Sequence, residues 1–166
     1  MMNQVVIIGA LELGGIFAIM SLGLYISYKV LNLPDLTVDG SFTLGCAVSA
    51  VMTLSGHPVI GLILAFISGL LAGLVTGVLT TKLKIASLLA GILTMTGLYS
   101  VNLKIMNDSP NISLFDCSTV FTPLSAFGEY GVLLFVGVVV IVVTLCLHYF
   151  LKTQFGLALR ACGDNE

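Results

Sequence analysis

The residues best suited to chemistry in this sequence are three acidic side chains in or beside long apolar segments: Glu12, Asp35 and Asp39. A carboxylate among apolar residues is costly, and such groups commonly line a path for a solute or an ion. Thr37, Asp39 and Ser41 are residue types that favour a helix N-terminus, which offers free N–H groups and a positive dipole end to a polar solute. We therefore expect these five residues to line such a path. A hydrated carboxylate at Glu12 and a purely structural loop at residues 33–41 remain the alternatives.

Catalytic and metal-binding motifs are not found in the sequence. There is no HExxH, GxSxG or GxxxxGK[ST] pattern, and the four cysteines have no metal-ligand spacing. His57 precedes a proline, and His148 has no carboxylate nearby in the sequence, so neither histidine suggests a catalytic pair. We predict that the chain is not an enzyme and that it holds no catalytic residue, metal or cofactor of its own.

The composition places the chain in a lipid environment. Of its 166 residues, 58% are hydrophobic and 8% are charged, against about 25% charged residues in an average soluble domain. Too little polar surface remains to cover a water-soluble globule of this length. The net charge is −2, and the sequence has no basic cluster that could follow nucleic-acid phosphates. Nucleic acid is therefore excluded as a partner, and the bilayer is expected.

Five apolar segments approach the length of about 20 residues that a helix needs to cross a bilayer. They cover residues 5–28, 35–54, 58–80, 85–105 and 130–150. In the second segment only the stretch from Ser41 to Leu54 is free of charge, and Pro34 and Gly40 precede it. This pattern predicts a helix that is broken or re-entrant. The expected fold is an all-α polytopic membrane protein with about five transmembrane helices, the second broken or re-entrant, in a single transmembrane domain over residues 1–166.

The basic residues predict how the spans are oriented. Five of the six lysines and arginines follow the first, third and fifth spans, which end on the same side of the membrane: Lys29, Lys82, Lys84, Lys152 and Arg160. The positive-inside rule assigns that side to the cytoplasm. We expect a multi-pass protein of the plasma (inner) membrane with its N-terminus outside, an external loop at residues 107–129, and a cytoplasmic segment at residues 152–166.

Small residues recur every fourth position in the third span, among them Gly69, Gly73 and Gly77. Without a hydrophobic force between helices in lipid, small residues let backbones approach closely. We expect these glycines to pack helices within the chain, with a seam between two copies as the alternative.

The segment that follows the fifth span is polar and contains several glycines, so it can neither insert into lipid nor form a core. We therefore expect it to serve a partner protein. The residues proposed for this contact are Thr153, Gly156, Leu157, Leu159, Arg160, Ala161 and Gly163.

Two motifs give the chain a family resemblance. The stretch Asp35-Leu36-Thr37-Val38-Asp39-Gly40-Ser41 and the segment from Thr153 to Glu166 resemble parts of the permease subunit of ABC importers of the branched-chain amino acid and ribose type. The sequence around Pro34 and the stretch from Ser87 to Thr96 are most similar to a subgroup of these permeases to which amino-acid transport is often assigned. The resemblance implies an external solute-binding lipoprotein, a second permease copy or paralogue, and a separate ATPase subunit that binds ATP and Mg.

Permeases of the family that this chain resembles continue for further spans. The resemblance therefore leads us to expect that this chain is an N-terminal portion, truncated within the segment that couples to the ATPase. The alternative function is an ion-coupled secondary carrier or channel that uses Glu12 and Asp39. The two hypotheses differ at residues 153–166, because a carrier needs no segment that docks on an ATPase.

Overall fold

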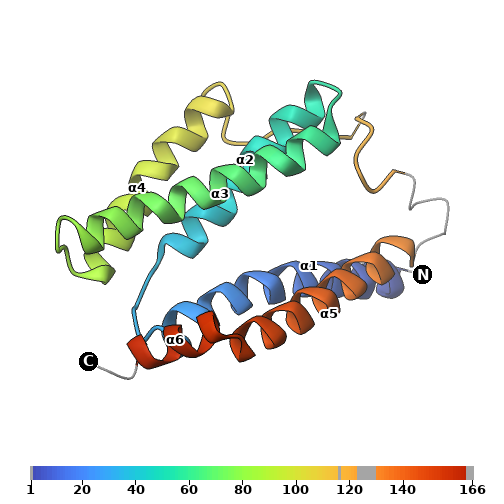
Figure 1. Cartoon of the computed structure of the whole chain (residues 1–166). Coiled ribbons are helices and arrows are strands. Elements are labelled where there is room, and N and C mark those ends of the chain that lie inside the picture. The colour runs from blue at the N-terminus through green and yellow to red at the C-terminus, as the bar shows by residue number, and fades with distance from the viewer. Residues whose placement is uncertain (1, 116, 123–129, 164–166) are drawn as a thin grey trace. The chain divides into compact units, whose positions relative to one another are not determined.

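The computed structural model describes residues 2–115, 117–122 and 130–163, and its regular elements are helices (Figure 1). In chain order they are α1 (Met2–Tyr25), the π-helical turn η1 (Ile26–Val30), α2 (Thr37–Leu54), α3 (Pro58–Thr81), α4 (Ser87–Ile105), α5 (Gly131–Lys152) and α6 (Gln154–Gly163). Five of these helical segments are long and apolar enough to cross a membrane. The predicted all-α class with five spans is confirmed.

The chain divides into two compact units. The first contains residues 1–33 and 121–166, and the second contains residues 34–120. Residues 123–129 of the predicted external loop and residues 164–166 of the C-terminal segment lie outside the described residues.

The first unit is built on α1 and α5, which run in the same direction. A Cβ atom on Gly15 of α1 would lie 2.5 Å from Cγ1 of Val136 in α5, so the absence of a side chain permits this contact. At the far end, Gly163 at the end of α6 lies against the carbonyl of Val30, the last residue of η1. The short helix α6 therefore connects the end of α5 to the end of η1.

The second unit is a bundle of α2, α3 and α4. Helices α2 and α3 form an antiparallel hairpin around Gly56, whose φ of +81° suits glycine. Gly61 near the start of α3 packs on Ser49 and Met52 near the end of α2. Helix α4 runs parallel to α2, because Gly40 lies beside Met95 at one level and Thr43 bonds Asn102 further along.

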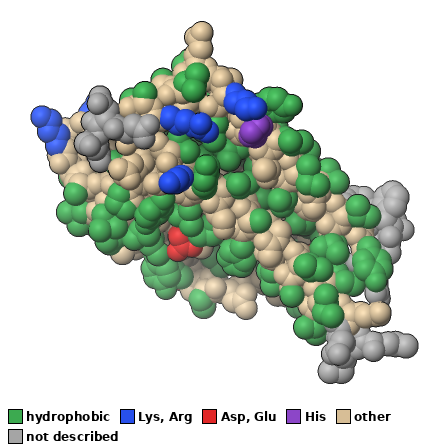
Figure 2. Space-filling view, turned by 90° about the horizontal axis from the view of Figure 1, so that it is seen from below, with side chains coloured by type: hydrophobic (Ala, Val, Ile, Leu, Met, Phe, Trp, Pro, Cys, Tyr) green, Lys and Arg blue, Asp and Glu red, His purple; other side chains and the backbone are tan. Residues whose placement is uncertain are grey.

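Most large apolar side chains lie on the surface. In the most apolar stretch of the first span, no residue is buried. Phe66 of α3 is 71% exposed and Leu134 of α5 is 68% exposed. Figure 2 shows hydrophobic side chains over much of the face that it presents. Exposed apolar surface on this scale suits contact with lipid, where the helices satisfy their backbone polar groups internally.

Candidate functional site

The predicted helix break lies before α2. Helix α2 is continuous over its 18 residues, and residues 32–36 form the irregular segment. Ser27 holds the start of this segment: its Oγ donates to the carbonyl of Leu33 at 2.7 Å, and its carbonyl accepts from the N–H of Leu33 at 3.1 Å. Pro34 follows and has no N–H to donate. The helical hydrogen-bond pattern therefore ends here and begins again at Thr37.

Asp35 begins the next helix. Its Oδ1 accepts the N–H of Thr37 at 2.8 Å, which satisfies one of the free donors of the first turn. The N-cap position itself is Leu36, which has no side-chain cap. Thr37, Asp39 and Ser41, although residue types that favour a helix N-terminus, all lie inside the helix.

Gly91 of α4 allows the break to pack against a neighbouring helix. A Cβ atom on Gly91 would lie 2.9 Å from both Asp35 Oδ1 and the backbone nitrogen of Leu36. The Oγ of Ser87, one turn earlier, donates to the carbonyl of Pro34 at 3.5 Å. The irregular backbone is thus held against protein, as required at membrane depth.

Thr37 belongs to a buried chain of hydroxyl groups that links three helices. Thr94 of α4 donates to the carbonyl of Ala90 at 2.9 Å, and Thr76 of α3 donates to Thr94 Oγ1 at 3.0 Å. With the Thr76 proton used in this way, Thr37 must donate across the 2.8 Å that separates its Oγ1 from that of Thr76. All three threonines are buried. The network gives the Thr37 hydroxyl a hydrogen-bond partner on another helix, which the sequence alone did not predict.

The structure brings together four of the five residues predicted for a solute path. Asp35, Thr37, Asp39 and Ser41 lie within the break and the first turns of α2, where Ser41 Oγ donates to the carbonyl of Val38 at 3.0 Å. Glu12 lies half-buried on α1, in the other unit. Their contact with a solute stays a prediction.

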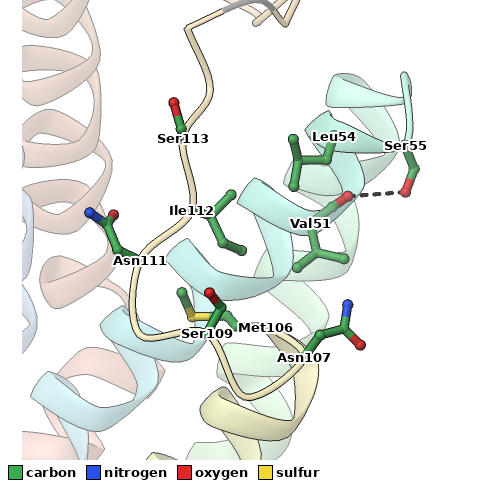
Figure 3. A pocket seen from close by; sticks show the side chains of 9 residues that line it. All are labelled: Val51, Leu54, Ser55, Met106, Asn107, Ser109, Asn111, Ile112 and Ser113. Atoms are coloured by element: carbon green, nitrogen blue, oxygen red, sulfur yellow. Dashed lines mark hydrogen bonds between the residues drawn. The ribbon is translucent and has the colours of Figure 1, made fainter.

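Two cavities lie further along the second unit, where residues 106–113 pass the ends of α2 and α4. One, of about 430 Å³, is drawn in Figure 3, where Ile112 points from the connecting segment toward Val51 of α2. The other, of about 480 Å³, lies between α2 and α4, and its polar side chains include Thr43, Asn102 and Asn111. None of the five predicted path residues lines either cavity.

Sequence reasoning missed these cavities because it searched for charged groups. The signal available in the sequence was Asn102, an uncharged polar residue within an apolar span. Its amide nitrogen donates to Thr43 Oγ1 at 3.3 Å, and its Oδ1 is buried and has no hydrogen-bond partner among the residues that the structure describes.

The segment predicted to serve a partner contains the helix α6. Thr153 sits at the corner between α5 and α6 with extended backbone angles, and its Oγ1 accepts the N–H of Gly156 at 3.4 Å, which is the geometry of an N-cap. A Cβ atom on Gly156 would lie 2.5 Å from Leu151 Cα and from the Phe150 carbonyl oxygen. Both glycines of the motif, Gly156 and Gly163, therefore fasten α6 to its own unit.

The other motif residues of α6 face outward to different degrees. Leu157 is 56% exposed, Arg160 and Ala161 are exposed, and Leu159 is half-buried. Phe155, which the sequence reading did not single out, is 77% exposed. The helix therefore presents apolar and basic side chains together while its glycines face inward.

The glycine stripe of α3 does not form one packing face. A Cβ atom on Gly69, Gly73 or Gly77 would meet no described atom within 4 Å, whereas Gly61 packs tightly on α2. Each four-residue step turns about 40° around a helix of 3.6 residues per turn, so the stripe winds away from the contact. These three glycines therefore meet no described helix of their own unit, and their packing against other parts of the chain stays a prediction. A seam with another subunit stays a prediction.

Comparisons with known proteins match nearly the whole chain to one family. Residues 6–166 match the family described as branched-chain amino acid transport system / permease component. The tyrosine transport system permease protein of Clostridioides difficile (strain R20291) is 42% identical over 152 residues, which are 91% of this chain and 50% of that protein. The uncharacterized protein RP368 of Rickettsia prowazekii (strain Madrid E) is 40% identical over 161 residues, 97% of this chain and 56% of that protein. The chain thus spans about half the length of these relatives. No solved structure matches it.

Proposed function

Because the chain belongs to the branched-chain amino acid transport permease family, we propose that it forms part of the membrane path of an ATP-driven amino-acid importer. The observation that carries this proposal is the family match over residues 6–166, together with the 42% identity to a tyrosine transport permease. An aromatic amino acid such as tyrosine is the first solute to test.

The proposed machinery needs further subunits. An external solute-binding lipoprotein delivers the amino acid, a second permease copy or paralogue completes the path, and an ATPase subunit binds ATP and Mg. This chain supplies no catalytic residue and no cofactor to that cycle. Its own contribution is the path and the docking of the ATPase.

Helix α6 is the proposed docking element. Its inner glycines fix it to the ends of α5 and η1, so a force applied to its outer face would act directly on two spanning helices. Leu157 and Leu159 provide apolar contact, and the exposed Arg160 provides a charge for a carboxylate or carbonyl groups on the partner. Thr153 holds the corner, and Ala161 leaves room for close approach.

The basic residues support a cytoplasmic position for α6. In the first unit Lys29, Lys152 and Arg160 all lie at the end where α6 meets η1. In the second unit Lys82 and Lys84 lie where α3 ends, whereas Lys104 lies at the opposite end of α4. By the positive-inside rule we place the N-terminus outside and the C-terminus in the cytoplasm.

Of the polar residues in the break and the first turns of α2, Asp39 is best suited to act on a solute. Asp35 already accepts the N–H of Thr37, and the Thr37 hydroxyl donates to Thr76, so both side chains have hydrogen-bond partners within the protein. Asp39 is half-buried in the first turn of α2. Glu12 and Ser41 complete the proposed path-lining set.

The test of function is uptake of radiolabelled L-tyrosine by cells that express the permease with the genes beside it, after depletion of ATP or of the ion gradient. ATP depletion should stop uptake, and an ionophore should not. Uptake that persists without ATP but collapses with the ionophore would establish the ion-coupled carrier instead.

The test of docking is co-purification with the ATPase. Loss of one member of a buried charged pair typically costs about 2–5 kcal/mol, so Arg160→Ala should reduce ATPase recovery by more than tenfold. Lys104→Ala, at the opposite end of its helix, is the matched control and should behave as wild type. Equal recovery from both variants would remove Arg160 from the docking contact.

A further inference from the structure

The cavity between α2 and α4 has the composition of a small-molecule site. Its volume of about 480 Å³ falls within the range of about 300–1,000 Å³ typical of ligand pockets. One wall is polar through Thr43 and Asn102, and the rest is largely apolar through side chains such as Ala47, Ala50 and Met106. An occupant would therefore meet hydrogen-bonding groups on one side and an apolar surface on the other.

Hydrogen bonds fix which way the Asn102 amide points. Thr43 Oγ1 donates to the carbonyl of Gly40 at 2.9 Å, so its proton is already used. The hydroxyl can then only accept from Asn102, which requires the amide nitrogen of Asn102 to face it. The Asn102 Oδ1 consequently points away from Thr43 and has no donor among the described residues.

An unpaired buried carbonyl oxygen is costly, and such a group in a folded protein calls for an explanation. The Oδ1 of Asn102 is covered in this arrangement, so an occupant can donate to it only when the Asn102 side chain, which lines the cavity, rotates and releases its bond to Thr43. The occupant that relieves this cost must carry an N–H or O–H donor. The polar wall therefore selects for a donor group, not for an anion.

The cavity also selects against net charge. None of the described residues that line it is acidic or basic, so a cation or an anion would lose its hydration without a counter-charge from them. A zwitterion carries an ammonium donor with no net charge. The apolar side chains around Ala50 and Met106 then suit an apolar or aromatic body, while the amide of Asn111, which also lines the cavity, can donate to a carboxylate.

We propose that this cavity is an amino-acid site on the permease, in which Asn102 Oδ1 accepts from the α-ammonium group and the α2 wall at Ala47 and Ala50 holds an apolar or aromatic side chain. This inference rests on the proposed function and adds the place and the chemical class of the solute. It makes Asn102 a binding residue that no charged-residue search would find.

The test is equilibrium binding of radiolabelled L-tyrosine to the full chain in lipid nanodiscs, with unlabelled competitors. L-Phenylalanine and L-leucine should displace the label. N-Acetyl-L-tyrosine, which lacks the ammonium group and so has a net charge of −1, and L-glutamate, which also has net charge, should not. Because this series uses only the wild-type chain, it gives a result even if a variant fails to fold.

Variants then locate the site. Asn102→Leu removes the acceptor at similar size and should weaken binding about tenfold or more, whereas Asn102→Asp keeps an acceptor for the ammonium group and should bind within a few-fold of wild type. Ala50→Trp should abolish binding by filling the cavity. Thr96→Val is the matched control, because Thr96 is exposed on the same helix and does not line the cavity.

Wild-type affinity in both Asn102→Leu and Ala50→Trp would overturn the site while leaving the importer proposal intact. Displacement by N-acetyl-L-tyrosine as effective as that by L-phenylalanine would overturn the role of the ammonium group. Absence of saturable binding, with a phospholipid acyl chain found in the cavity, would also overturn the site. Failure of the proposed function itself is separate, since it would show as loss of ATP-dependent uptake by the wild-type permease.

Discussion

Gly91 offers the sharpest test of how the helix break is held. It is buried on α4 directly against the irregular segment, and a Cβ atom there would lie 2.9 Å from both Asp35 Oδ1 and the Leu36 nitrogen. Contacts this short involve backbone as well as a carboxylate, so the neighbour cannot simply rotate away. Gly91→Ala should therefore displace the break from α4 and disturb the bond from Thr37 N–H to Asp35.

The magnitude follows from two losses and one gain. Overpacking typically costs about 1–3 kcal/mol. Loss of a helix-capping bond costs about 0.5–2 kcal/mol. Alanine in place of glycine within a helix recovers about 1 kcal/mol, which would by itself stabilise the protein. Gly97 on the same helix has open space around its Cβ position, so Gly97→Ala receives only that gain. The difference between the two variants isolates the packing and capping losses, and we expect it to be about 1.5–5 kcal/mol.

The assay is unfolding of the purified chain by SDS in dodecyl maltoside micelles, followed by circular dichroism because the chain has no tryptophan. Gly91→Ala should unfold at a lower SDS fraction than wild type, and Gly97→Ala at an equal or higher fraction. Equal free energies of unfolding for the two alanine variants would refute the reasoning, because the break would then not be packed against α4 as the structure shows.

Three further perturbations test other contacts. Gly61→Leu should lower the free energy of unfolding in the same assay because its Cβ meets α2, whereas Gly73→Leu should leave it unchanged or raise it, because leucine is the better helix former; a loss at Gly73 would show that this face is packed after all. Thr76→Val should cost about 1–3 kcal/mol by leaving two buried hydroxyls without their partner, and the exposed Thr96→Val should cost little; equal costs would contradict the buried network. Gly156→Ala should destabilise the corner before α6, measured as faster proteolysis after residue 153; wild-type proteolysis would contradict the tight contact with α5.

Local sequence was sufficient to predict the spans and the break. A bilayer demands a certain length of apolar helix, and length and hydropathy can be read along the chain without knowledge of any neighbour. Pro34 removes a donor and ends the helical pattern wherever the segment lies. The start of a helix after Thr153 is local in the same sense, because threonine and the residues directly after it make the cap.

Only the tertiary structure decided which residues meet across helices. The glycines of α3 share a spacing of four, yet the helix turns them progressively away from α2, so Gly61 packs while Gly73 lies open. Thr37, a cap by residue type, donates instead to Thr76, which is 39 residues away. The candidate role of Asn102 follows from its side-chain Oδ1, which has no hydrogen-bond partner among the described residues, and from the cavity that Asn102 lines. The physical reason is common to all three: the partner that satisfies a polar group or fills the space beside a glycine comes from another helix, and its position depends on how the helices cross.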